Sequence, residues 1–272
     1  MGTGAIRGRP DDAPTTGVEM AELIRSTIDG AVAVVTMAKP PHNLIDGAMI
    51  DELIAAFEGA ADDGARAILL NSDMKHFCAG ADVDGLGDSD RQRLPSAEVL
   101  ARLEGVSLPT IASVHGLALG GGFELALACD FILAGSSARL GLVETTLGLA
   151  PLLGGVQRVV ERAGATRGKE IAMFGRRHDP ETLERWGIIN VVVDDDELAN
   201  ASMSFARQLA AGPTVSYGAI KRLAAIAVAD GVTAADQAQD REVEPVWASE
   251  DLQTGFRAFA ETGPGTAIFL GQ

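Results

Sequence analysis

Two isolated carboxylates are the residues of this sequence best suited to proton transfer. Glu124 shares the stretch 116–138 with one other charged residue, and Glu144 is the only charged residue between 140 and 157. A carboxyl group in such apolar surroundings is expected to be partly buried, and burial raises its pKa toward the range useful for general acid–base catalysis. A buried glutamate that caps a helix or pairs with a distant arginine is the simpler interpretation for one such residue, but not for two. We therefore predict that Glu124 and Glu144 act together.

Glycine-rich turns lie close to these carboxylates. Gly120–Gly122 would let the backbone approach a ligand closely, and the helix expected to follow would point free N–H groups at it. A second turn, HFCAGADVDGL (76–86), follows a predicted strand. Each turn could supply one backbone amide, and two amides form an oxyanion hole. The glycines could instead serve only the tight packing of a helix on a strand.

The elements that must position these residues follow from the hydrophobic pattern. Short apolar runs predict strands at 31–37, 67–71, 110–114 and 131–134, and helical spacing predicts helices around 49–57 and from about 121 to 129. Alternating strands and helices up to about residue 193 indicate an α/β fold. After 195, apolar segments separated by Gly-Pro and Gly-Val-Thr predict three or four helices without strands. We therefore expect a mobile tail (1–20), an α/β core (21–194) and a C-terminal helical region (195–272).

Composition excludes several classes of function. A hydrophobic content of 47% over 272 residues can fill a sizeable core, and a net charge of −16 disfavours nucleic acids and anionic membranes as partners. The two cysteines form no CxxC pair, so a zinc site or a disulfide scaffold is not expected. The start has no apolar core of a signal peptide, and the uncharged stretch 105–123 contains a proline and five glycines that would break a membrane helix. A soluble, cytoplasmic protein is predicted.

Segments that resemble common ligand-binding motifs lack the residue spacing that those motifs require. AGATRGKE lacks the glycine spacing and the Ser/Thr of a phosphate loop, and GGGFEL lacks the third glycine of a dinucleotide fingerprint. The acidic run DVDGLGDSD (82–90) has a leucine at the third ligand position of a calcium loop. These motifs therefore predict no metal site and no dinucleotide-binding site.

Several motifs in order resemble one family. HFCAGADV, PTIASVHGLALGGGFELALACDF and GLVETTLGLAPLLGGVQR are similar to segments of the crotonase (enoyl-CoA hydratase/isomerase) superfamily, and WGIINVVV and EDLQTGFRAFAE follow in the family's order. The resemblance covers about residues 28–262. It implies a spiral of ββα units with C-terminal helices that assemble a homotrimer or a dimer of trimers. It also implies an acyl-CoA thioester as substrate, so that coenzyme A is part of the substrate and no further cofactor is needed.

The resemblance assigns roles to individual residues. It implies that the amides of Ala81 and Gly121 form the oxyanion hole and that Glu124 and Glu144 are the catalytic pair of a hydratase, which adds water across the C2=C3 bond of a trans-2-enoyl-CoA. By analogy Glu144 gives a proton to C2, and Glu124 orients and activates the water. Further substrate contacts are expected at Ala79, Gly80, Asp82, Leu86, Gly120, Leu152 and Leu153.

Three departures from the family pattern accompany the match. Asp84 replaces a basic residue, APLLGG (150–155) replaces the more usual PPGAGG, and the C-terminal ETGPGTAIFLG lacks a Lys-Arg pair. Candidate partners for the CoA phosphates are then Lys39, Lys75 and the Lys221–Arg222 pair.

Other functions on this scaffold stay open. The alternatives are a Δ3,Δ2-enoyl-CoA isomerase, an acyl-CoA hydrolase or decarboxylase, and a non-catalytic or RNA-binding member. Isomerases commonly lack the equivalent of Glu124, and an RNA-binding member needs a basic patch that the net charge disfavours. A glycoside hydrolase could also use two carboxylates, but an aromatic content of 4% opposes it.

Overall fold

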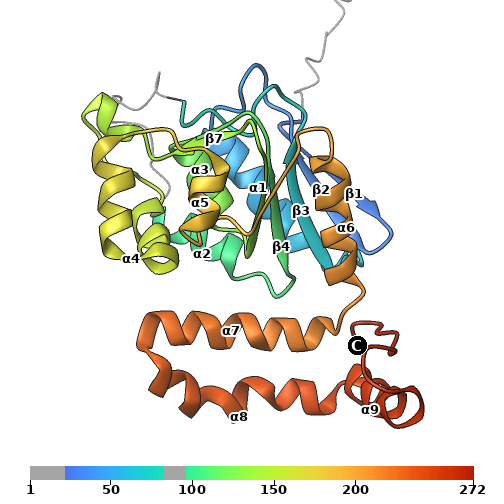
Figure 1. Cartoon of the computed structure of the whole chain (residues 1–272). Helices are drawn as coiled ribbons and strands as arrows, with labels where there is room; N and C mark the ends of the chain where they lie inside the picture. The colour runs from blue at the N-terminus through green and yellow to red at the C-terminus, as the bar shows by residue number, and fades with distance from the viewer. Residues whose placement is uncertain (1–21, 83–95) are drawn as a thin grey trace, which may run out of the picture.

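The structure is a computed structural model that describes residues 22–82 and 96–272. Its centre is a six-stranded sheet in the order β1-β2-β3-β4-β6-β8, in which only β1 and β2 are antiparallel (Figure 1). The strands are β1 (Ile24–Asp29), β2 (Val32–Met37), β3 (Ala67–Ser72), β4 (Thr110–Val114), β5 (Leu117–Leu119), β6 (Phe131–Gly135), β7 (Arg139–Gly141) and β8 (Val191–Val193). All four predicted strands are present within a residue or two of their expected ends.

A second, smaller sheet lies beside the main one, and its segments follow one another in the same order along the chain as the strands of the main sheet. Its strands β5 and β7 are parallel, and isolated bridges extend it on both sides through Ile45↔Ala81, Cys78↔Ala118 and Leu140↔His178. A long strand of the main sheet is thus followed by a short strand of the second layer and then by a helix, as in β4–β5–α3 and β6–β7–α4. The predicted α/β fold of repeated ββα units is confirmed.

The helices surround these sheets on several sides. They are α1 (Gly47–Gly59), α2 (Ser96–Glu104), α3 (Gly121–Leu127), α4 (Gly155–Phe174), α5 (Pro180–Arg185), α6 (Leu198–Ala210), α7 (Thr214–Asp230), α8 (Val232–Ala248) and α9 (Glu250–Thr262), together with the 3₁₀ helix η2 (Glu144–Leu147). Helix α1 shows why such segments are helical. Asp46 caps its first turn by accepting from the Met49 amide, and its buried side chains recur every three or four residues.

Two apolar layers stabilise the core, one on each face of the main sheet. The larger layer includes the fully buried Phe57, Phe77 and Phe123, and each such side chain contributes about 1.5–3 kcal/mol by leaving water. Helix α6 covers the other face, packed on β2, β3, β4 and β6. Its buried residues Leu198, Ser202, Ala206 and Ala210 are mostly small and four positions apart, which lets the helix lie close to the strands.

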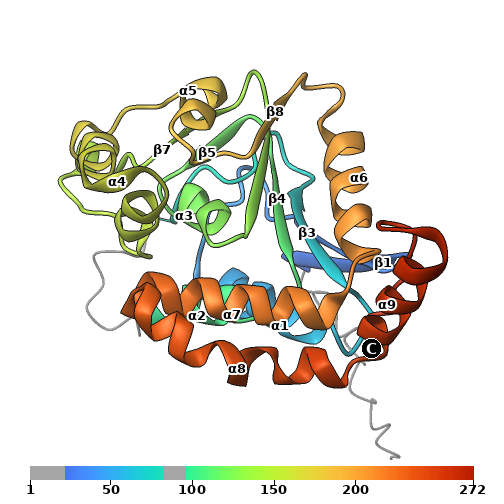
Figure 2. The ribbon, with the colours of Figure 1, turned by 60° about the horizontal axis from the view of Figure 1, so that its bottom comes forward.

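The C-terminal residues from 198 onward form four helices and no strand, as predicted, but these helices do not form one unit. Helix α6 belongs to the core, whereas α7 and α8 lie side by side as a hairpin in a separate layer, followed by α9 (Figures 1 and 2). Most α6 side chains facing the sheet are small, so the sequence pattern does not distinguish α6 from the helices that follow.

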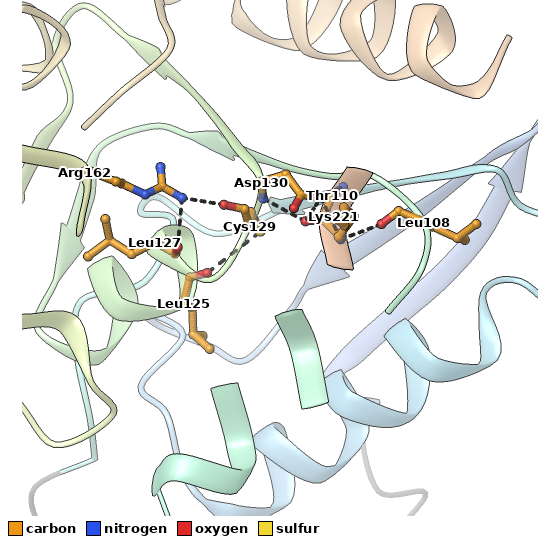
Figure 3. A network of polar contacts seen from close by, with 8 residues as sticks. All are labelled: Leu108, Thr110, Leu125, Leu127, Cys129, Asp130, Arg162 and Lys221. Atoms are coloured by element: carbon orange, nitrogen blue, oxygen red, sulfur yellow. Dashed lines mark hydrogen bonds and ion pairs between the residues drawn. The ribbon is translucent and has the colours of Figure 1, made fainter. Parts of the chain in front are cut away.

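A polar network fastens the α7 layer to the core (Figure 3). Lys221 of α7 forms a 2.7 Å ion pair with Asp130 and donates to the Leu108 carbonyl. Asp130 also accepts from the amide and hydroxyl of Thr110, at 2.8 and 3.0 Å. Close by, Arg162 of α4 donates to two carbonyls at the C-terminal end of α3. The short helix α3 is therefore held firmly at the end opposite its glycines.

Candidate active site

Glu124 is a buried carboxylate held by backbone amides. It lies in the first turn of α3 and is 1% exposed. Its Oε1 accepts from the Leu153 amide at 2.9 Å and from the Gly155 amide at 2.7 Å. Burial raises the pKa of Glu124, while these two amides and the positive charge of Arg158 partly offset the rise. Within the described residues both of these hydrogen bonds go to Oε1, so Oε2 is the oxygen that could accept from a water molecule or a substrate.

Glu144 is in the opposite situation. It begins η2 and is partly buried, yet within the described residues neither of its carboxyl oxygens has a hydrogen-bond partner. Burial, with a further contribution from the negative charge of Glu124, raises the pKa of Glu144 to about 7. Its carboxyl group lies against the turn before α3, since a Cβ built on Gly120 would be 3.1 Å from Oε1. The two glutamates come from different elements, yet they are close enough for the charge of Glu124 to act on Glu144.

The turns next to β5 bring two backbone amides together. Gly121 begins α3, so its N–H has no acceptor within the helix. Ala81 pairs with Ile45 in a bridge made by the amides of Ile45 and Asp82, so the Ala81 N–H points to the other side. A Cβ built on Gly121 would lie 3.9 Å from the Ala81 nitrogen. The structure therefore makes neighbours of the two residues predicted to form an oxyanion hole.

Glycine has a separate function at each position of the Gly120–Gly122 turn. Gly120 has φ 51°, a left-handed conformation that favours glycine. A Cβ on Gly122 would lie 2.4 Å from the Cys78 carbonyl oxygen, so Gly122 permits the close packing of α3 on the turn after β3. The packing interpretation of these glycines is correct for Gly122, and the same packing is what places Gly121 beside Ala81.

Gly155 makes the position of Glu124 possible, and this leads to a first prediction. A Cβ there would be 2.7 Å from Cγ of Glu124 and 2.8 Å from Cδ2 of Leu142. Gly155→Ala keeps the amide but should displace the carboxylate, and we expect kcat to fall by up to about 100-fold. The measurement is steady-state turnover of an enoyl-CoA.

Gly59→Ala is the matched control for this substitution. Gly59 ends α1, and a Cβ there would have no neighbour within 4 Å. We expect unchanged kcat and a gain in stability of up to about 1 kcal/mol, because alanine favours the helix. Equal turnover in the two variants would contradict the positioning role of Gly155.

Some of the remaining predicted substrate-contact residues lie close to Ala81 and Gly121, and others do not. Ala79 and Gly80 precede Ala81 and bond the segment 42–45 through the Ala79 amide and the Gly80 carbonyl. Leu153 approaches Gly121, with its Cδ1 3.7 Å from the Cβ position of that residue, whereas Leu152 is 46% exposed. The backbone of Asp82 bonds Ile45. Leu86 and Asp84 lie outside the described residues.

Most of the candidate phosphate-binding residues already have protein partners. Lys39 pairs with Asp46 at 2.5 Å and donates to the Leu44 carbonyl. Lys221 is engaged in the network of Figure 3, and Arg222 pairs with Glu242. Lys75 is exposed. Of these four cations, Lys75 alone has no ion pair within the described residues.

Sequence reasoning missed three residues of this site. They are Gly155, which admits the Glu124 side chain; Ile45, whose Cδ1 lies 3.0 Å from the Cβ position of Gly121; and Arg158, whose charge acts on Glu124. The Gly-Gly pair at 154–155 and an arginine one helical turn later were visible signals. Nothing in the sequence indicated that they face Glu124 rather than solvent.

Two features that the described part of the chain lacks bear on possible ligands. Across residues 22–82 and 96–272, no group of three or more His, Cys, Asp or Glu side chains is arranged to hold a metal ion. In the same ranges no helix is both long and apolar enough to cross a membrane.

The fold and the paired carboxyl groups define a mixed α/β protein of ββα units with a candidate acid–base site. Comparison with known proteins specifies the family. The enoyl-CoA hydratase/isomerase family profile matches residues 27–266. The chain therefore belongs to the enoyl-CoA hydratase/isomerase family, whose fold is the crotonase fold.

Individual relatives agree with this assignment. A carnitinyl-CoA dehydratase of Salmonella arizonae is 33% identical over an alignment of 255 positions, which covers 89% of this chain and 97% of the relative. A probable enoyl-CoA hydratase of Rhizobium meliloti is also 33% identical, over 88% and 95% of the two chains. A crystal structure of an enoyl-CoA hydratase subunit I from Geobacillus kaustophilus superimposes with a TM-score of 0.85 at 35% identity, covering 92% of this chain and 99% of that one.

Proposed function

We propose that this protein is an enoyl-CoA hydratase that reversibly adds water across the C2=C3 bond of a trans-2-enoyl-CoA. The observation that carries the proposal is the asymmetry of the two glutamates beside the Ala81–Gly121 amide pair. Glu124 is held by two amides and is near a positive charge, whereas Glu144 has a pKa of about 7 and no hydrogen-bond partner among the described residues. One is suited to accept a proton and the other to give one.

The proposed reaction proceeds through a thioester enolate. The Glu124 carboxylate accepts a proton from water while the water oxygen bonds to C3. The electrons of the C2=C3 bond move toward the thioester, and the amides of Ala81 and Gly121 stabilise the oxyanion that forms. Glu144 then gives its proton to C2, and the thioester carbonyl is restored. The pair holds one proton before and after the reaction, first on Glu144 and then on Glu124.

A Δ3,Δ2-enoyl-CoA isomerase is the second candidate. That reaction needs one group to move a proton between two carbons, and the unpartnered carboxyl of Glu144 alone could do so. The position of Glu124, with one carboxyl oxygen committed to amides and one left over, favours the hydratase because it provides a place for water.

A substrate panel separates these candidates. Crotonyl-CoA, longer trans-2-enoyl-CoAs, a trans-3-enoyl-CoA and carnitinyl-CoA would be incubated with the protein, and the products identified by mass. Addition of water to a trans-2-enoyl-CoA supports the hydratase. Conversion of the 3-enoyl to the 2-enoyl thioester without a gain of water would overturn it. Loss of water from carnitinyl-CoA, with no reaction of the other thioesters, would assign the activity named for the Salmonella relative.

The pH dependence provides a further prediction. Only the singly protonated pair is competent, with the proton on Glu144 for hydration and on Glu124 for dehydration. As the pH rises through about 7, Glu144 loses its proton and both directions should slow. At low pH Glu124 becomes protonated and both should slow again. We expect bell-shaped pH profiles of kcat/KM, with the same acidic and alkaline limbs for hydration and for dehydration. Alkaline limbs that differ between the two directions would contradict the assignment of one shared proton to the two glutamates.

The proposed assembly is a homotrimer or a dimer of trimers. Exposed apolar side chains on the C-terminal layer support it, since Trp247, Phe256 and Phe259 are each more than half exposed in the single chain.

A further inference from the structure

Arg158 connects the site to helix α2. It lies in α4, and its side chain is 17% exposed. Its Nη1 donates to the Gly154 carbonyl at 3.1 Å. The other edge of the guanidinium binds Glu104, the last residue of α2, through Nε to Oε1 at 2.5 Å and through Nη2 to Oε2.

The carbonyl that Arg158 binds belongs to the turn that holds Glu124. Gly154 lies between Leu153 and Gly155, whose amides both donate to Oε1 of Glu124. Gly154 has φ 97°, and a Cβ there would be 2.6 Å from Nη1 of Arg158. The guanidinium is therefore packed directly on this turn, and its hydrogen bond fixes the Gly154–Gly155 peptide, whose N–H is one of the two donors to Glu124.

Charged groups reach the carboxyl pair from three elements. The charge of Glu124 on α3 acts on Glu144 of η2, and the charge of Arg158 on α4 acts on Glu124. Arg158 lowers the pKa of Glu124 against the effect of burial, and among the described residues no such cation acts on Glu144. Glu104 partly neutralises Arg158 from the far side.

We propose that Arg158 is a positioning residue that determines which glutamate carries the single proton of the pair. It holds the turn that binds Oε1 of Glu124, and its charge keeps Glu124 ionised so that the proton resides on Glu144. Glu104 moderates this charge. The catalytic consequence rests on the proposed hydratase function, whereas the effect on Glu124 does not.

Two substitutions that break the same ion pair test the proposal, because they should have opposite effects. Arg158→Met removes the positive charge, so Glu124 should become protonated at higher pH. Glu104→Gln leaves Arg158 with its charge less neutralised, so Glu124 should become protonated at lower pH. A merely structural link between α2 and α4 predicts changes in the same direction for both. Arg158→Lys keeps the positive charge but cannot bind both carboxyl oxygens of Glu104 at once. It should leave the titration of Glu124 near that of the parent protein.

The titration is followed by NMR of protein with ¹³C-labelled glutamate carboxyl groups. A Glu144→Gln background removes the coupling between the two sites, so Glu124 titrates in one step. Its resonance is assigned by its loss in Glu124→Gln. At a fixed pH, we expect Arg158→Met to lower the ratio of ionised to protonated Glu124 by at least about tenfold. An unchanged ratio, or shifts in the same direction for Arg158→Met and Glu104→Gln, would overturn the proposal.

Activity measurements on the single variants add the catalytic consequence. In Arg158→Met with Glu144 intact, the acidic limb of kcat/KM should move to higher pH, and kcat at the optimum should fall by up to about 100-fold. The NMR result does not require turnover. Opposite NMR shifts without any hydration by the parent protein would therefore refute the hydratase proposal while supporting the role of Arg158.

Discussion

Glu144→Gln should lower kcat for crotonyl-CoA hydration by about 10²- to 10⁴-fold, the usual contribution of a general acid or base. Glutamine has nearly the same shape as glutamate but cannot give a proton to C2. The site offers no evident substitute, because both carboxyl oxygens of Glu144 lack a partner among the described residues. Turnover is measured as loss of the enoyl-thioester absorbance. Full activity in this variant would remove Glu144 from the mechanism.

A stability measurement on the same variant is the control for folding. The pKa of Glu144 in the folded protein is about 7, above its ordinary value of 4.5, so the folded state binds the extra proton more tightly. The favourable contribution of that proton is complete below 4.5 and is lost as the pH rises through about 7. Above pH 7 the folded protein must therefore hold an ionised Glu144 carboxylate in a partly buried place, which lowers the free energy of unfolding. Glu144→Gln removes this cost because glutamine does not ionise. It should therefore raise the free energy of unfolding at pH 8 by at most about 3 kcal/mol and leave it nearly unchanged at pH 4.

Glu124→Gln should lower kcat by a similar factor for a different reason. The glutamine Oε1 can still accept from the Leu153 and Gly155 amides, so the turn should keep its structure. The group that replaces Oε2 cannot take a proton from water. Because the two side chains act as a unit, the double variant should be little slower than either single one. Multiplied effects in the double variant would indicate that they act in separate steps.

Gly121→Pro should lower kcat by about 10²- to 10³-fold by deleting one amide of the proposed oxyanion hole. The position suits this test, because Gly121 is the first residue of α3, where proline is tolerated. Its Cβ would lie 3.0 Å from the flexible end of Ile45 and 3.7 Å from that of Leu153, so some adjustment of the side chains is expected. Circular dichroism and thermal unfolding check that the helix remains.

Gly121→Ala separates loss of the amide from added bulk. It places a Cβ at the same position and keeps the N–H, so we expect kcat to stay within about tenfold of the parent. An equal loss in the alanine and proline variants would show that crowding at Ile45, and not the missing hydrogen bond, is responsible. Retention of activity by the proline variant would exclude the Gly121 amide from the mechanism.

Much of the fold could be predicted because its signals are local. The β-branched run at 31–37 and the apolar spacing of 49–57 each correspond to one observed element, β2 and α1. The start of α3 at Gly121 was predicted from its glycines, while its end lies two residues earlier than expected. The position of α6 could not be predicted, since its contacts with the sheet are made mostly by small side chains whose partners lie far away in the sequence.

The sequence alone determined that Glu124 and Glu144 stand in apolar surroundings beside glycine-rich turns, because hydrophobic pattern and glycine spacing are properties of the chain itself. Only the tertiary structure decided how the two carboxyl groups differ. The amides of Leu153 and Gly155 and the charge of Arg158 reach Glu124 from a segment some thirty residues away, whereas Glu144 has no hydrogen-bond partner within the described chain. A proton affinity depends on desolvation and on charges close in space, and folding alone brings these groups together.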